Sequence, residues 1–125
     1  MAGVRQRRRS GFDLVMKTGE IWLAQLDPTI GREIQKTRPC VVISPNEMNE
    51  HLKTVIVAPM TTGSRPAGFR VPMSFQGKHG LIVLDQVRTL DHSRLVKRLG
   101  ALRPLTLGAT LNTLQAMFAP HRTAL

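Results

Sequence analysis

Short apolar runs, separated by turn-forming residues, follow one another along the chain from Gly19 to about residue 90. We predict strands over 21–26, 39–43, 54–58, 69–71, 80–84 and 87–90, with a short helical turn over 46–52. Asp27-Pro28 ends the first run, Ser44-Pro45 ends the second, and a turn is predicted over 76–80. Several short strands with such turns are typical of a small, mainly β barrel.

The pattern changes near the C-terminus, where Pro104 precedes a segment with helical spacing. Leu107, Leu111, Leu114 and Phe118 recur every three or four positions there. We therefore predict one amphipathic helix after Pro104, with this stripe packed on the barrel.

The length of 125 residues suits one domain with one core. We divide the chain into a flexible basic arm (1–15), a folded domain (16–120) and a short tail (121–125). The arm is either dispensable or adds nonspecific affinity for RNA phosphates. Met16 opens the folded part and is an alternative start to Met1.

The composition favours a cytoplasmic protein that binds a polyanion. The net charge is +10, from 18 Lys and Arg against 8 Asp and Glu. The arm's arginines account for only part of it, so the basicity belongs to the domain as well. No apolar run approaches the roughly 20 residues of a membrane helix, and no signal peptide is visible. Cys40, the single cysteine, is expected to be a buried free thiol.

Candidate chemistry gathers in three polar clusters, each next to the end of a predicted strand. Because a small barrel brings strand ends together, we expect the clusters to converge on one face. Guanidinium groups there would suit a phosphate ligand. None of the four histidines has a partner at metal-ligand spacing, and no nucleotide-binding glycine motif occurs, so we predict neither metal nor cofactor. The clusters are Arg32, Glu33, Lys36 and Arg38; Thr61, Thr62 and Arg65; and Asp85, Gln86 and Arg88.

Three sequence blocks carry a family resemblance. GEIWLAQLDPTIGREIQKTRPCVVISP at 19–45, PMTT at 59–62 and LDQVRTLD at 84–91 resemble, in order, the blocks of the MazF/PemK family of toxin endoribonucleases. The resemblance covers nearly the whole chain outside the arm. It implies a small SH3-like barrel with a C-terminal helix, a homodimer, and an antitoxin as partner.

The same resemblance implies an activity. Members of the family cleave single-stranded RNA, often mRNA, at short sequences without a metal. The 2′-OH attacks the adjacent phosphorus and leaves a 2′,3′-cyclic phosphate and a 5′-OH end. Such cleavage would inhibit translation and growth.

By this resemblance, Arg38 and Thr61 are the primary catalytic pair. A guanidinium does not readily give up its proton, which makes Arg38 a poor base, so we expect it to stabilise the pentacoordinate transition state. Proton transfer falls to Glu33 or Asp85, or to Arg38 only in an unusual environment, although Glu33 could instead position Arg38 and Asp85 could be structural. The residues expected to contact RNA, each of which could alternatively be a solvated or turn-capping side chain, are Arg32, Lys36, Thr62, Arg65, Gln86 and Arg88.

Two positions depart from the family pattern. Members with a His before the loop Glu have Arg32 here, and members with an Arg two residues before the Asp of the third block have Val83 here. We therefore do not assign to this chain a mechanism that depends on that His or on that second Arg. Trp22 is either a core residue or part of a dimer interface. Two other functions stay open on the same fold: a CcdB-like inhibitor of DNA gyrase, and an RNA-binding module without catalysis.

Overall fold

The computed structural model describes residues 15–120, so the basic arm, apart from Val15, and the C-terminal tail lie outside the described residues. The first half of the described chain forms β1 (Glu20–Gln25), β2 (Thr37–Val42), helix α1 (Asn46–His51) and β3 (Thr54–Thr61). The second half forms β4 (Arg70–Phe75), β5 (Lys78–Val83), the 3-10 turn η1 (Leu84–Gln86), β6 (Arg88–Asp91), the 3-10 turn η2 (His92–Arg94), β7 (Leu95–Ala101) and helix α2 (Pro104–Phe118).

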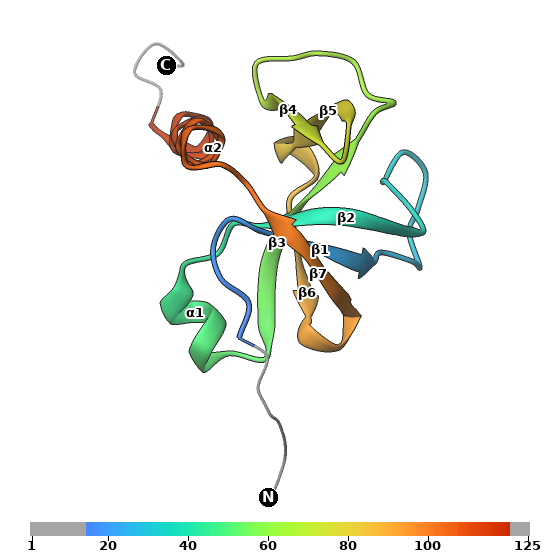
Figure 1. Cartoon of the computed structure of the whole chain (residues 1–125), viewed down its shortest axis with the longest axis vertical. Helices are drawn as coiled ribbons and strands as arrows, with labels where there is room; N and C mark the ends of the chain where they lie inside the picture. The colour runs from blue at the N-terminus through green and yellow to red at the C-terminus, as the bar shows by residue number, and fades with distance from the viewer. Residues whose placement is uncertain (1–14, 121–125) are drawn as a thin grey trace, which may run out of the picture.

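The strands form one curled antiparallel sheet in the order β4-β5-β3-β2-β1-β7, and β6 pairs with β3 beside this path. Figure 1 shows the β4–β5 hairpin bent away from the plane of β2 and β1, with α2 alongside the hairpin and α1 at the other end of the molecule. The prediction of a mainly β, small barrel fold with a C-terminal helix is confirmed, and the sheet has the form of a curled half-barrel. Neither described helix is long and apolar enough to cross a membrane.

The central strands are apolar on both faces because each face packs against a separate core cluster. Successive strand residues point to opposite faces. In β1, Ile21 belongs to one cluster and Trp22 to the other, and in β2 the same holds for Val41 and Val42. This two-sided burial explains the near-continuous apolar runs in the sequence. Trp22 is only 5% exposed, so it is a core residue.

Strands β3 and β4 are longer than predicted because each continues through a proline. Pro59 pairs with Cys40 of β2 and lies where β3 changes its other partner from β6 to β5. Pro72 lies in β4, an edge strand, where a missing N–H donor is tolerated. The predicted turn over 76–80 is shorter than expected, with the positive φ angles confined to Gln76 and Gly77.

Strand β7 was not predicted. Most of its residues are exposed, since it is the edge strand next to β1. Because Lys97 and Arg98 occupy its centre, the sequence lacks the apolar alternation that would predict a strand. Helix α2 was predicted, but Phe118 does not belong to its packed face: the Phe118 side chain is 74% exposed, and Met117 packs on the core beside Leu114 instead. The packed face of α2 therefore ends at Met117 and not at Phe118.

Candidate functional site

Arg38 and Thr61 line the same hollow. It has a volume of about 230 Å³ and is formed by the end of β3, the start of β2 and the β4–β5 hairpin. Its lining residues are Arg38, Pro39, Met60, Thr61, Thr62, Met73, Phe75, Gln76, Lys78 and Gly80. Two predicted clusters thus meet here through Arg38 from the first and Thr61 and Thr62 from the second. We call this space the Arg38 hollow.

The Arg38 side chain is oriented by the loop that precedes β2. Its Nε donates a hydrogen bond of 3.2 Å to the carbonyl oxygen of Gln35. Among the described residues, no hydrogen-bond partner is found for the two terminal nitrogens of Arg38. The planar fork therefore keeps donors that suit a phosphate group.

The Thr61 hydroxyl is also set up as a donor. Its Oγ1 accepts the backbone N–H of Gly63 at 3.1 Å, which leaves the hydroxyl hydrogen free to point at a ligand. The backbone of β5 passes very close: a Cβ added to Gly80 would lie 2.8 Å from the Thr61 carbonyl oxygen. Glycine at position 80 therefore allows the approach that fixes Thr61.

Glu33 and Asp85 do not line the Arg38 hollow. They line a second hollow of about 470 Å³, together with Gln86, Arg88 and Pro59. Pro59 and Met60 are consecutive in β3 and so point to opposite faces, which separates the two hollows. The single convergent cleft expected from the sequence is thus divided into two.

Gln86 and Arg88 hold the loop between β1 and β2. The Gln86 side chain accepts the N–H of Ile34 at 2.7 Å through Oε1 and donates to the carbonyl of Arg32 at 3.2 Å through Nε2. Arg88 Nη1 donates to the carbonyl of Leu26 at 3.1 Å. In the structure, the polar groups of both side chains therefore bind the protein's own backbone and support the loop.

Glu33 shapes the tip of the same loop. Its Oε1 accepts the N–H of Ile30 at 2.7 Å, while its own N–H donates to the Ile30 carbonyl at 3.2 Å. This reciprocal pair closes a tight turn and leaves Ile30 82% exposed at the tip. Glu33 makes no ion pair with Arg38 within the described part of the chain.

Asp85 forms a two-pronged ion pair with Arg70. Its two oxygens accept N–H groups from Arg70 Nε at 3.0 Å and Nη2 at 2.9 Å. The hydrogen bonds to Arg70 hold the pKa of Asp85 below its usual value. Arg70 was missed by the sequence analysis because it lies outside the three blocks, on a strand whose pairing to β5 brings it near Asp85.

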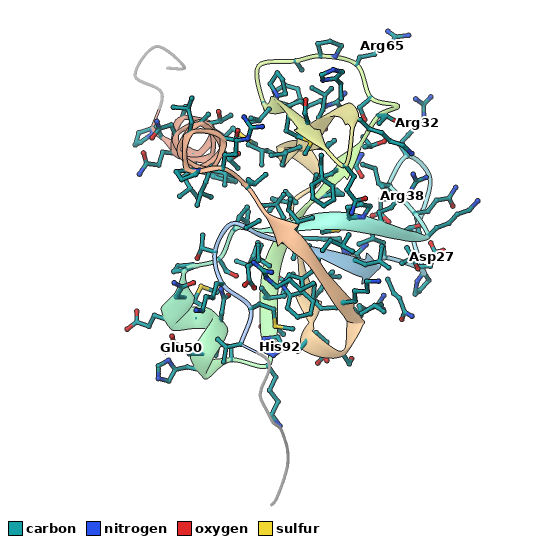
Figure 2. All side chains as sticks on the ribbon, in the orientation of Figure 1. Asp27, Arg32, Arg38, Glu50, Arg65 and His92 are labelled. Atoms are coloured by element: carbon teal, nitrogen blue, oxygen red, sulfur yellow. The ribbon has the colours of Figure 1, made fainter. Side chains whose placement is uncertain are left out.

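The other predicted RNA contacts are spread around the Arg38 hollow. Arg32, Lys36 and Arg65 are exposed, and Figure 2 shows Arg32, Arg38 and Arg65 on the same side of the molecule, away from α2. Lys78, which lines the Arg38 hollow from the hairpin, was not predicted. In the sequence, the position of Lys78 as a basic residue in a predicted turn was the only feature that could have indicated a phosphate contact. Among residues 15–120 no group of three His, Cys, Asp or Glu side chains could hold a metal ion.

A third hollow continues from the first along the hairpin. It has a volume of about 570 Å³ and shares Met73, Phe75, Gln76 and Gly80 with the Arg38 hollow. Its polar lining includes His79, whose Nδ1 lies 2.7 Å from the Ser74 hydroxyl oxygen, and the exposed Arg103. The two hollows therefore adjoin along the hairpin.

Comparison with known proteins agrees with this arrangement. A family model described as PemK-like, MazF-like toxin of type II toxin-antitoxin system matches residues 17–118. The endoribonuclease PemK of Escherichia coli is 42% identical over 81 residues, and the matched part spans 61% of this chain and 61% of that relative's length. The endoribonuclease MazF of Staphylococcus epidermidis is 34% identical over 91 residues, which cover 68% of this chain and 76% of the relative.

Solved structures share the fold. MazF from Deinococcus radiodurans superposes with a TM-score of 0.74 at 25% identity, covering 84% of this chain and 97% of that one. A mycobacterial endoribonuclease, solved in complex with its cognate antitoxin, superposes with a TM-score of 0.71 at 23% identity, covering 85% of this chain and 98% of the other. The similarity thus extends over most of the described chain.

Proposed function

The chain belongs to the family of PemK-like, MazF-like toxins of type II toxin-antitoxin systems, and we propose that it is an endoribonuclease that cleaves single-stranded RNA at selected sequences. The observation that carries this proposal is the meeting of the Arg38 guanidinium and the Thr61 hydroxyl in one hollow. Both groups keep donors that a phosphodiester can use.

In the proposed reaction the 2′ oxygen forms a bond to the adjacent phosphorus while the bond from phosphorus to the 5′ oxygen breaks. The 2′-OH loses its proton and the leaving 5′ oxygen gains one, which yields a 2′,3′-cyclic phosphate and a 5′-OH end. Negative charge develops on the phosphoryl oxygens in between. Arg38 and Thr61 are placed to donate hydrogen bonds to those oxygens, and Lys78 adds a positive charge at the same hollow.

Proton removal is assigned to water in this proposal. The lining of the Arg38 hollow includes no carboxylate and no imidazole among the described residues. Glu33 and Asp85, the carboxylates considered from the sequence, are hydrogen-bonded elsewhere in the structure. The rate enhancement would then come mainly from stabilisation of charge in the transition state.

We further propose a homodimer and an antitoxin as protein partners. A mycobacterial relative and the MazF of Deinococcus radiodurans were each solved together with an antitoxin. The net charge of +10 favours an acidic partner segment that folds over the exposed Arg32, Lys36 and Arg65 as it binds.

The test is RNA cleavage in EDTA, followed by analysis of the product ends. We expect cyclic phosphate ends, and we expect Arg38→Ala and Thr61→Ala each to lower kcat by roughly 10²-fold or more. Lys97→Ala is the matched control, because it removes one positive charge from the exposed middle of β7. Near-normal cleavage by Arg38→Ala would refute the assignment.

Assays of gyrase inhibition and of RNA binding, made beside the cleavage assay, separate the alternatives. Inhibition of DNA gyrase without RNA cleavage would favour a CcdB-like poison. RNA binding that depends on Arg38, without any cleavage, would favour a non-catalytic RNA-binding module.

A further inference from the structure

The Arg70–Asp85 pair lies between the loops 26–36 and 62–69, both of which carry residues proposed to contact RNA. We infer that Arg70 is a positioning residue, whose pair with Asp85 ties the loop 62–69 to the loop 26–36 and so holds the Arg38 hollow in shape. This inference rests on the proposed function. Arg70 itself is not among the residues that line the Arg38 hollow, so it would act through others.

On one side, Arg70 fixes the loop 62–69. Its Nη1 donates to the carbonyl of Arg65 at 2.9 Å, and its backbone N–H donates to the carbonyl of Ala67 at 3.0 Å. The guanidinium carbon also lies 5.6 Å from the centre of the Phe69 ring, within the range of a cation–π contact. Thr61 and Thr62 lie at the other end of this loop.

On the other side, Asp85 belongs to the turn η1. The neighbouring Leu84 is fully buried, and its N–H donates to the carbonyl of Phe69 at 3.2 Å, so the turn is anchored. The next residue, Gln86, makes the two hydrogen bonds that hold Ile34 and Arg32. Direct bonds thus run from the loop 62–69 through Arg70, Asp85 and Gln86 to the loop that leads into Arg38.

The pairing of β4 and β5 explains why this position carries an arginine. Arg70 is the cross-strand partner of Val83, two residues before Asp85, which places the guanidinium within reach of the carboxylate. Three donor bonds come from one side chain: two parallel bonds to Asp85 and one to Arg65. Only a planar fork can make them at once, so a lysine would not be an equivalent replacement.

The geometry also gives Asp85 a role other than proton transfer. Each of its oxygens accepts an N–H of Arg70, and Asp85 does not line the Arg38 hollow, so the carboxylate is engaged in the pair rather than directed at the proposed reaction site. The lowered pKa agrees with a carboxylate that stays charged in the pair. Arg70 and Asp85 should therefore act as a unit, and substitutions of either should have similar, non-additive effects.

The test compares Arg70→Lys, Asp85→Asn, the double variant, and the charge-swapped pair Arg70→Asp with Asp85→Arg. The control is Arg98→Lys, because Arg98 forms the comparable exposed ion pair with Glu20 at 2.9 Å on β7 and β1. For each protein, kcat and KM for RNA cleavage are measured, together with the thermal midpoint and backbone hydrogen exchange in residues 30–36 and 62–69.

We expect each single variant to lower kcat about tenfold, through misplacement of the groups around the reacting phosphate. The double variant should be no worse than either single one, the swapped pair should regain part of kcat, and both loops should exchange faster in the single variants. The Arg98→Lys control should match the wild type.

Two results would overturn the inference. One is a loss beyond 10²-fold in Asp85→Asn with an active Arg70→Lys, which would make Asp85 a catalytic group. The other is unchanged hydrogen exchange in both loops. If the wild-type protein cleaves no RNA, the proposed function fails, while the exchange measurement still decides whether Arg70 couples the loops.

Discussion

Replacing Gly80 by alanine would test whether Thr61 depends on the backbone of β5 for its position. The added Cβ would lie 2.8 Å from the Thr61 carbonyl oxygen and 3.3 Å from its carbonyl carbon. Both are backbone atoms of β3, so no flexible side chain can move aside. To reach ordinary contact at 3.4 Å, the two strands must separate by about 0.6 Å.

Such a shift should affect activity more than binding. A displacement of 1 Å at a catalytic group can cost about 10²-fold, so we expect kcat to fall between roughly 10- and 100-fold in Gly80→Ala. KM should change little, because Arg38 and Lys78 remain to hold phosphate. Overpacking should also lower the unfolding free energy by about 1–3 kcal/mol, and so the melting temperature by at least several degrees.

The measurement is steady-state cleavage of a short fluorogenic RNA well below the melting temperature, with thermal unfolding followed in parallel. Gly68→Ala is the control, because a Cβ there meets nothing within 4 Å and its backbone is not in the left-handed region. A folded Gly80→Ala with wild-type kcat would refute the claim that this approach positions Thr61. An equal loss in Gly68→Ala would show that the effect is not local.

Four further predictions concern the core and the Asp85 pair. Burial raises the pKa of Cys40 to about 12, so the stability that the neutral thiol contributes should be present below pH 9 and be lost as the pH rises toward 12. In chemical unfolding, the free energy of unfolding should fall less over this pH range in Cys40→Ala than in the wild type. The same thiol should react with a disulfide reagent at pH 8 only when the protein unfolds. Trp22→Ala should cost about 3–5 kcal/mol in chemical unfolding, and a loss below 1 kcal/mol would contradict its core position. Because Arg70 lowers the pKa of Asp85 below 3.8, the pair should stabilise the fold above pH 4 and lose this effect as the pH falls through the lowered value, a dependence that acid unfolding of Asp85→Asn should lack.

Much of the fold could be predicted from local pattern alone. The runs that became β1, β2 and β3 were visible because burial on both faces makes their central parts apolar, and β5 and β6 were visible as shorter apolar runs. The edge strand β7 was missed since only one face of an edge strand needs to be apolar and Lys97 and Arg98 occupy its centre. Phe118 was misplaced because helical spacing predicts a stripe but not where the supporting surface ends.

The meeting of Arg38 and Thr61 in the candidate site was predictable, but the division of the site into two hollows was not. The sequence places polar groups at the ends of strands, and this suffices to bring Arg38 and Thr61 together. It does not show which face of β3 each group joins, because that depends on the register at Pro59 and Met60. Arg70 was out of reach for the same reason, as its role depends on a cross-strand pairing with Val83.

The division of the site suggests why the third block of the sequence carries the residues it does. The polar groups of this block form hydrogen bonds within the protein. Asp85 accepts from Arg70, and Gln86 and Arg88 bond to the backbone of the loop before β2. That loop includes Gln35, whose carbonyl orients Arg38. Without these bonds the exposed loop would be mobile, and ordering a phosphate-binding guanidinium on it would cost conformational entropy each time RNA binds. The third block thus contributes to the proposed reaction by fixing the Arg38 loop before RNA arrives, which makes loss of kcat, rather than loss of fold, the expected result of changing it.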